Sequence, residues 1–163
     1  MKLLIVLALL TGLLTGCGSA APGETLGNIM EEIPQLPPPR EVQVTLPGEA
    51  AIPTMEQSGQ RYYLCDDYEI TLGRQPSGDL AATVKDLSGY APEDLTVMET
   101  DTPGARRYDF VWTTTGEQGQ QLGRAAVLDD GNYHYTLSVL RDADTTESLQ
   151  VSWNQVFSSF SLG

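Results

Sequence analysis

Apolar and polar residues alternate between Leu95 and Arg141, and this pattern limits the chain to few folds. Tyr108, Phe110 and Trp112, for example, are separated by one residue each. A period of two is typical of a strand with one face in the core. The alternating segments are separated by turn residues at Thr102-Pro103-Gly104, at Gly116-Glu117-Gln118-Gly119 and at Asp129-Asp130-Gly131. The pattern therefore predicts a four-stranded antiparallel meander, apolar on one face and polar on the other.

The loop at Asp129-Asp130-Gly131 decides the register of the last two strands. A two-residue Asp130-Gly131 turn would place Arg124 on the same face as Leu137. A three-residue loop, with Gly131 in the left-handed conformation, would put Val127 beside Tyr133 and turn Arg124 to solvent. We predict the three-residue loop.

Further elements precede the meander. Short strands are expected at 42–46, 61–65 and 68–72, with a loop at 73–78. The segments 61–65 and 68–72 are either two strands or one strand bent at Asp66-Asp67. Asp79 can cap a helix that ends at Gly89. The apolar positions of this helix are Leu80, Ala81, Val84 and Leu87.

A second helix is predicted to close the domain. Asp144 and Glu147 have the spacing of a capping box. The apolar residues that follow at helical steps are Leu149, Trp153, Val156, Phe157 and Phe160. The sheet's aromatic face is the natural place for this helix to pack. The chain thus predicts an α+β domain, an antiparallel β-meander packed on one face by two helices.

This order of elements resembles the PsbP-like superfamily, which includes the Mog-type proteins. The resemblance spans 61–163: a helix, a meander and a closing helix that ends in Ser159-Phe160-Ser161-Leu162. It implies a non-catalytic adaptor or binding module, and it transfers no functional residue to this chain.

The N-terminus has the pattern of a secretory signal. Lys2 is followed by an almost entirely apolar run from Leu3 to Leu14, shorter than the roughly 20 residues of a membrane span. Leu14-Thr15-Gly16-Cys17 resembles the lipobox of bacterial lipoproteins. The resemblance implies cleavage before Cys17, a diacylglycerol on its thiol and often an acyl chain on the new amine. The alternative is an ordinary secretory signal with an incidental cysteine.

Three segments are therefore expected: a signal peptide at 1–16, a lipidated spacer and stalk at 17–40, and a globular domain at 41–163. Within the second segment, Leu26, Ile29, Met30 and Ile33 share one face of a short amphipathic stretch at 24–33, whose role the sequence leaves open. The prolines at 34 and 37–39 end it and favour a semi-rigid extended stalk.

Charge and cysteine content exclude several classes of function. The net charge of −13, with no basic stripe, argues against nucleic acid as a partner. Once Cys17 is lipidated, Cys65 is the only other cysteine, so no intramolecular disulfide is expected. One thiol and one histidine cannot build a structural zinc site, and we expect no cofactor or metal.

Two residues could in principle carry chemistry. His134, the only histidine, is predicted to lie with Thr136 and Ser138 on the polar, solvent-facing side of the sheet. Cys65 is typical of a small buried hydrophobe rather than a nucleophile. The acid pairs Asp66-Asp67 and Asp129-Asp130 are expected to serve turns rather than calcium.

Tyrosines are frequent in the domain. Core packing is expected for Tyr108, Tyr133 and Tyr135, whereas Tyr62 and Tyr63 could also serve a ligand groove or an interface.

The sequence therefore predicts a lipoprotein on the extracytoplasmic face of the cell membrane, anchored through Cys17. It is expected to act as a binding or adaptor module for an envelope protein. The alternative is a cell-envelope hydrolase that uses Cys65 or His134. Contact between these two side chains in one cleft would favour the enzyme.

Overall fold

The computed structural model describes residues 35–116, 119–143 and 148–163. The predicted signal peptide, Cys17 and the amphipathic stretch at 24–33 lie outside the described residues, as does the predicted capping box of Asp144 and Glu147. Within the described ranges, no helix is long and apolar enough to cross a membrane.

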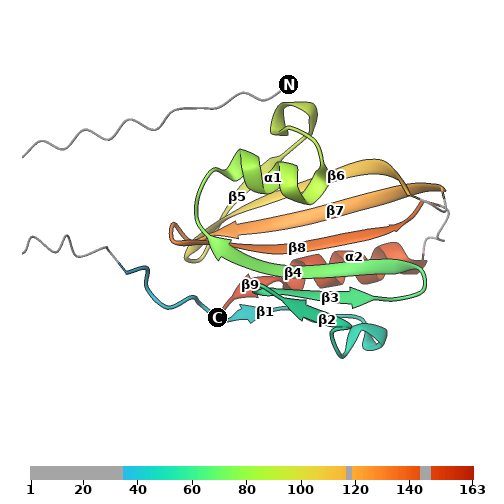
Figure 1. Cartoon of the computed structure of the whole chain (residues 1–163), viewed down its shortest axis with the longest axis horizontal. Helices are drawn as coiled ribbons and strands as arrows, with labels where there is room; N and C mark the ends of the chain where they lie inside the picture. Colours follow the sequence, from blue (N-terminus) through green and yellow to red (C-terminus); the bar gives the residue numbers. More distant parts are fainter. Residues whose placement is uncertain (1–34, 117–118, 144–147) are drawn as a thin grey trace, which may run out of the picture. The chain divides into compact units, whose positions relative to one another are not determined.

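Seven antiparallel strands form one sheet in the order β2-β3-β4-β8-β7-β6-β5 (Figure 1). Their bounds are β2 Met55–Gln57, β3 Gln60–Leu64, β4 Tyr68–Pro76, β5 Met98–Thr102, β6 Ala105–Gly116, β7 Gly119–Asp129 and β8 Tyr133–Asp142. Strands β5 to β8 follow one another along the chain, so the predicted meander is confirmed. Strand β4 then pairs with β8 along nine residues, and it runs through most of the segment that we predicted as a loop at 73–78.

The two helices pack on opposite faces of this sheet (Figure 1). Helix α1 (Leu80–Ser88) buries Val84 against Tyr108, Phe110 and Trp112. Helix α2 (Ser148–Ser159) packs against the other face, which carries a larger core. The α+β class is confirmed, but the placement of α1 differs from the prediction, because the polar face of β8 is covered as well.

Strand β7 shows why both faces are covered. The four consecutive residues Ala125 to Leu128 are all buried. Ala125 and Val127 belong to the core under α1, while Ala126 and Leu128 belong to the core under α2. A continuous apolar run is the mark of a strand that is buried on both sides.

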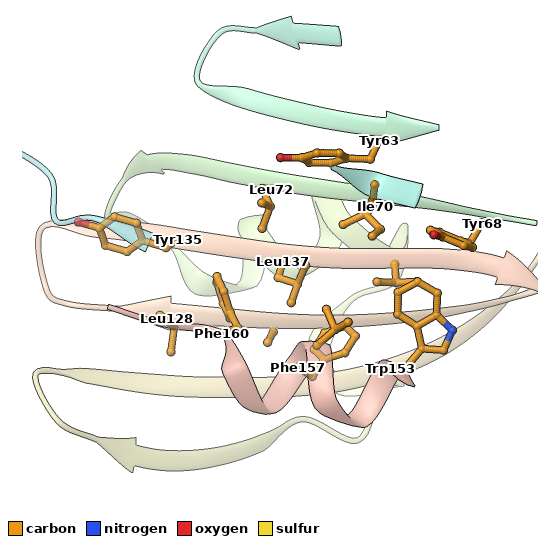
Figure 2. Packing of buried hydrophobic residues seen from close by; sticks show 14 residues of the cluster. Tyr63, Tyr68, Ile70, Leu72, Leu128, Tyr135, Leu137, Trp153, Phe157 and Phe160 are labelled. Atoms are coloured by element: carbon orange, nitrogen blue, oxygen red, sulfur yellow. The ribbon is translucent and has the colours of Figure 1, made fainter. Parts of the chain in front are cut away.

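The core on the α2 face is mainly aromatic. Trp153 and Tyr68 meet edge to face, with ring centroids 4.8 Å apart. Figure 2 shows Trp153 and Phe157 on α2, and Phe160 just after it, turned toward Ile70 and Leu137 of the sheet.

Side-chain and backbone contacts fix both ends of α1 and the C-terminal end of α2. The side chain of Asp79 accepts a hydrogen bond from the N–H of Ala81, and Gly89 adopts the left-handed conformation, as predicted. The guanidinium of Arg107 donates to the carbonyls of Phe157 and Phe160 at 2.9 and 3.0 Å. A cation is favoured there because the last carbonyls of a helix carry partial negative charge.

The register between β7 and β8 differs from the prediction. Asp129 pairs with His134, so Asp130, Gly131 and Asn132 lie between the two strands, and Val127 is opposite Thr136 instead of Tyr133. Gly131 is left-handed, as expected. The carboxylate of Asp130 accepts from the N–H groups of Asn132 and Tyr133, and its own N–H donates to the carbonyl of Tyr133, so the turn closes between Asp130 and Tyr133. The resulting register places Arg124 opposite Val139 on the α2 face instead of in solvent.

A second, two-stranded sheet fastens the ends of the compact unit at Gln35–Gly163. Strand β1 (Val42–Gln43) pairs with β9 (Ser161–Leu162). Nearby, the backbone N–H of Arg40 donates to the Tyr135 hydroxyl, and the Tyr133 hydroxyl donates to the carbonyl of Pro37. The end of the predicted stalk is therefore held against the sheet.

Candidate functional site

A cavity of about 720 Å³ is lined by α2, by strands β6 to β8 and by the segment that follows α1. Val111 on β6 and Leu122 on β7 contribute apolar side chains to it, and Val111 is 61% exposed. From the segment after α1, Tyr90 and Leu95 line the same cavity. This volume lies within the range of about 300–1,000 Å³ that is typical of ligand pockets.

The cavity reaches around the outer edge of β6. Trp112 lies on the α1 face, whereas Arg124 lies on the α2 face, yet both line it. This is possible because β5 accompanies β6 only as far as the pair Met98–Asp109. We call this cavity, together with the edge of β6 at 110–116, the edge groove.

Arg124 supplies a cation to the edge groove. Its guanidinium lies over the ring of Phe157, 4.2 Å from the centroid, and donates to Asn154 Oδ1 at 2.9 Å. Burial lowers the pKa of Arg124, and the neighbouring Arg107 lowers it further against the opposing effect of Asp109. Asp109 itself is held by Arg107 in a two-point ion pair at 2.6 and 2.9 Å. Arg124 therefore forms no ion pair with a carboxylate among the described residues, although the charge of Asp109 acts on it.

A glycine allows Trp112 to pack where it does. Trp112 and Gly123 are cross-strand partners, and a Cβ on Gly123 would lie 2.0 Å from the indole. The indole therefore lies flat over the backbone of β7, and one wall of the edge groove depends on a residue without a side chain.

Trp153 also lines this cavity, and its indole contains a buried donor. Its side chain is 5% exposed, and its indole N–H is the one buried side-chain polar atom without a partner in the part of the chain that the structure describes. An unpaired buried donor costs about 1–3 kcal/mol.

His134 lies on the face that we predicted, but under α1 and not in solvent. It is 1% exposed, and its Nδ1 lies 2.8 Å from the hydroxyl of Thr83 on α1. Gln75 donates to the same hydroxyl at 2.8 Å. Helix α1 therefore packs on the polar face of β8. The alternation of polar and apolar residues alone does not reveal this.

Ser77 and Asp129 also surround His134, but not as a catalytic triad. Both approach the same nitrogen, Nε2, with Ser77 Oγ at 3.4 Å and Asp129 Oδ2 at 3.9 Å. The Ser77 hydroxyl donates to Asp129 rather than to the imidazole. In a triad the acid holds the opposite ring nitrogen, which here contacts Thr83.

Cys65 is remote from His134. It is half-buried in the turn before β4 and packs against the core under α2. His134 pairs with Gln75 near the other end of β4 and faces α1. Burial raises the pKa of the nearby Tyr68 hydroxyl, and Cys65 raises it further. The structure does not bring Cys65 and His134 into one site.

The acid pairs serve turns, as expected. Asp66 and Asp67 are exposed between β3 and β4. Burial acts to raise the pKa of Asp130, but hydrogen bonds from Asn132, Tyr133 and Tyr135 outweigh it, and the pKa is lowered. No group of acidic, histidine or cysteine side chains that could hold a metal occurs within the described ranges.

The tyrosines divide between core and surface. Tyr63, Tyr108 and Tyr135 are buried, and Tyr133 and Tyr62 are half-buried. The Tyr62 hydroxyl is hydrogen-bonded to Gln60. None of these five lines the edge groove, whose tyrosine is Tyr90.

No family model matches this sequence, and no curated protein matches it.

Proposed function

We propose that this chain is a lipoprotein that is tethered to the cell membrane through Cys17, on the extracytoplasmic side. It acts as a binding or adaptor module, and its edge groove contacts an envelope protein. The resemblance of residues 61–163 to the PsbP-like superfamily is part of this proposal.

The observation that carries the proposal is the edge groove. It offers the exposed side chain of Val111, the aromatic residues Trp112 and Phe157, and the guanidinium of Arg124, which has no ion pair among the described residues, around one cavity. A mostly apolar cavity with a few placed polar groups is the usual form of a binding site.

The arrangement of the described residues does not favour the hydrolase alternative. His134 is enclosed beneath α1, and Cys65 lies on the other face of the sheet. Neither residue lines the edge groove.

The test compares two arginine substitutions in the full chain. Val111→Arg places a charge in the edge groove, whereas Ile52→Arg places one at a residue that is 81% exposed and outside the groove. In pull-downs from intact envelopes, one defined protein should be captured by the parent and by Ile52→Arg, and lost with Val111→Arg. Equal capture by all three proteins would rule out the groove as the binding site.

The tether is tested separately with Cys17→Ser, which removes the thiol that the lipobox pattern requires. This variant should lose metabolic labelling with a radioactive fatty acid and leave the membrane fraction. A labelled, membrane-bound Ser variant would contradict the lipoprotein assignment.

A further inference from the structure

The outer edge of β6 is open for half of its length. Strand β6 extends to Gly116, but its partner β5 pairs with it only from Ala105 to Asp109. Beyond Asp109, the described residues place no strand on that side. Residues 110–116 therefore form a free strand edge, which is the part of the edge groove that β6 contributes.

The register shows which backbone groups face this free edge. Gly116 and Gly119 flank the β6–β7 turn as a pair, and Thr102 and Ala105 flank the β5–β6 turn in the same way. Residues two apart along a strand direct their N–H and C=O groups to the same side. Even-numbered residues of β6 therefore face β7, and odd-numbered residues face β5 or the free edge.

A side-chain contact agrees with this assignment. The hydroxyl of Tyr90 donates to the carbonyl of Thr113 at 2.8 Å, as a carbonyl that faces the free edge allows. The backbone groups of Val111 face the same way. Tyr90 thus occupies one of the acceptors that an added strand would use.

The side chains around the free edge suit an extended peptide. Alternate residues of an added strand would project toward the two faces of the sheet. The edge groove has walls on both faces, with Val111 and Arg124 on the α2 face and Leu95 and Trp112 on the α1 face.

The positive charge of Arg124 specifies an acidic residue at one position of such a peptide. Val111 and Arg124 are direct cross-strand partners, so a peptide residue beside Val111 would continue the same row across the sheet. Arg124 has no carboxylate partner among the described residues, and its guanidinium is half-buried in the groove. An acidic side chain on the α2 face would neutralise it.

We propose that the free edge of β6 binds an extended segment of the partner protein by strand addition, with an acidic side chain of that segment paired to Arg124. This inference rests on the proposed function and specifies how the groove recognises its partner. Tyr90 then acts as a competitor that leaves Thr113 when the segment binds.

The test uses short random peptides displayed on phage and selected on the full chain in mild detergent. Selected peptides should carry an aspartate or glutamate among alternating apolar residues. Their affinities are then measured by fluorescence anisotropy against the parent and a set of variants. Trp112 and Trp153, the only tryptophans, both line the groove and report occupancy by their own emission.

The central variant is Val111→Pro, with Val111→Ala as its matched control. Both substitutions remove the exposed valine side chain, but only proline also removes the backbone N–H that faces the free edge. Because that N–H belongs to no ladder, β6 should still pair with β7. Proline should weaken peptide binding by about tenfold or more, the equivalent of about 1.4 kcal/mol, and alanine by clearly less.

Two further variants test the side chains. Arg124→Gln should weaken acidic peptides about tenfold and leave peptides with the acid replaced by its amide unchanged. Tyr90→Phe should tighten binding, because it releases the Thr113 carbonyl.

Strand addition is overturned if Val111→Pro binds like Val111→Ala, if the selected peptides lack an acidic residue, or if peptides bind only to a dimer of the chain. The proposed function survives the first two results if Val111→Arg still abolishes peptide binding. It fails together with the inference if none of the groove variants alters binding.

Discussion

The two faces of the sheet are built from different chemistry. The α2 face joins Trp153, Phe157 and Phe160 to a large aromatic and aliphatic core. The α1 face has a smaller core around Val84, and beside it a buried polar contact between His134 and Thr83. Apolar burial is favourable in any orientation, whereas a buried hydrogen bond is favourable in only one. We therefore expect the α2 face to supply most of the stability. On the α1 face, the contact between His134 and Thr83 fixes the position of α1.

The proposed binding surface lies where these two faces meet. At the free edge of β6, neither helix covers Val111, and β5 no longer pairs with its strand. Both faces are occupied by packed helices, whereas the edge between them is the surface that we propose for recognition.

The largest effect is expected from the α2 face. Trp153→Ala should cost about 3–5 kcal/mol of the free energy of unfolding, because it removes a buried aromatic side chain. Trp153→Phe should cost less, since it keeps a ring and deletes a donor that has no acceptor. Thermal melts of the full chain check both values. If Trp153→Ala melts like the parent, α2 is not packed on the sheet as described.

A smaller loss is expected on the α1 face. His134→Ala removes the partner of Thr83 and leaves polar groups buried, which should cost about 1–3 kcal/mol. Ser138→Ala, on the same strand and face but without a comparable contact, should change stability by about 0.5 kcal/mol or less. Equal melts for the two variants would show that the imidazole does not hold α1.

The smallest effect concerns pH. The lowered pKa of Asp130 means that the folded state favours its ionised form. Its contribution is present above the ordinary value of 3.8 and is lost as the pH falls through the lower folded pKa. Asp130→Asn should therefore melt slightly below the parent at neutral pH and lose less stability on acidification. The effect would be refuted if the parent and Asp130→Asn lost the same amount of stability as the pH was lowered.

The sequence was informative where the signal is local. The meander, the Asp79 cap and the Gly89 stop of α1 were predicted from turn residues and periodicity, and the structure confirms them. The face of β8 on which His134 lies was also predicted correctly.

The burial of His134 was not predictable from β8 alone, because the alternation of polar and apolar residues does not reveal what covers a polar face. The apolar run from Ala125 to Leu128 was the available sign of burial on both faces. The register at Asp130 was missed because its carboxylate closes the turn, a side-chain contact that the position of the glycine does not reveal.

The edge groove could not be predicted from the sequence, since it depends on where β5 leaves β6. Only two hints were present in the chain: an arginine within an apolar strand, at Arg124, and a glycine at Gly123 that leaves room for a large side chain.

Amide hydrogen exchange along β6, in the free full chain and with a selected acidic peptide, tests the central claim most directly. In the free chain, the N–H of Val111 should exchange quickly because it faces the open edge, while that of Trp112 should be slow because it faces β7. Adding the peptide should slow Val111 and leave the opposite edge strand, β2, unchanged. Fast exchange at Val111 in the presence of saturating peptide, or protection that appears at β2 instead, would contradict recognition at the free edge of β6.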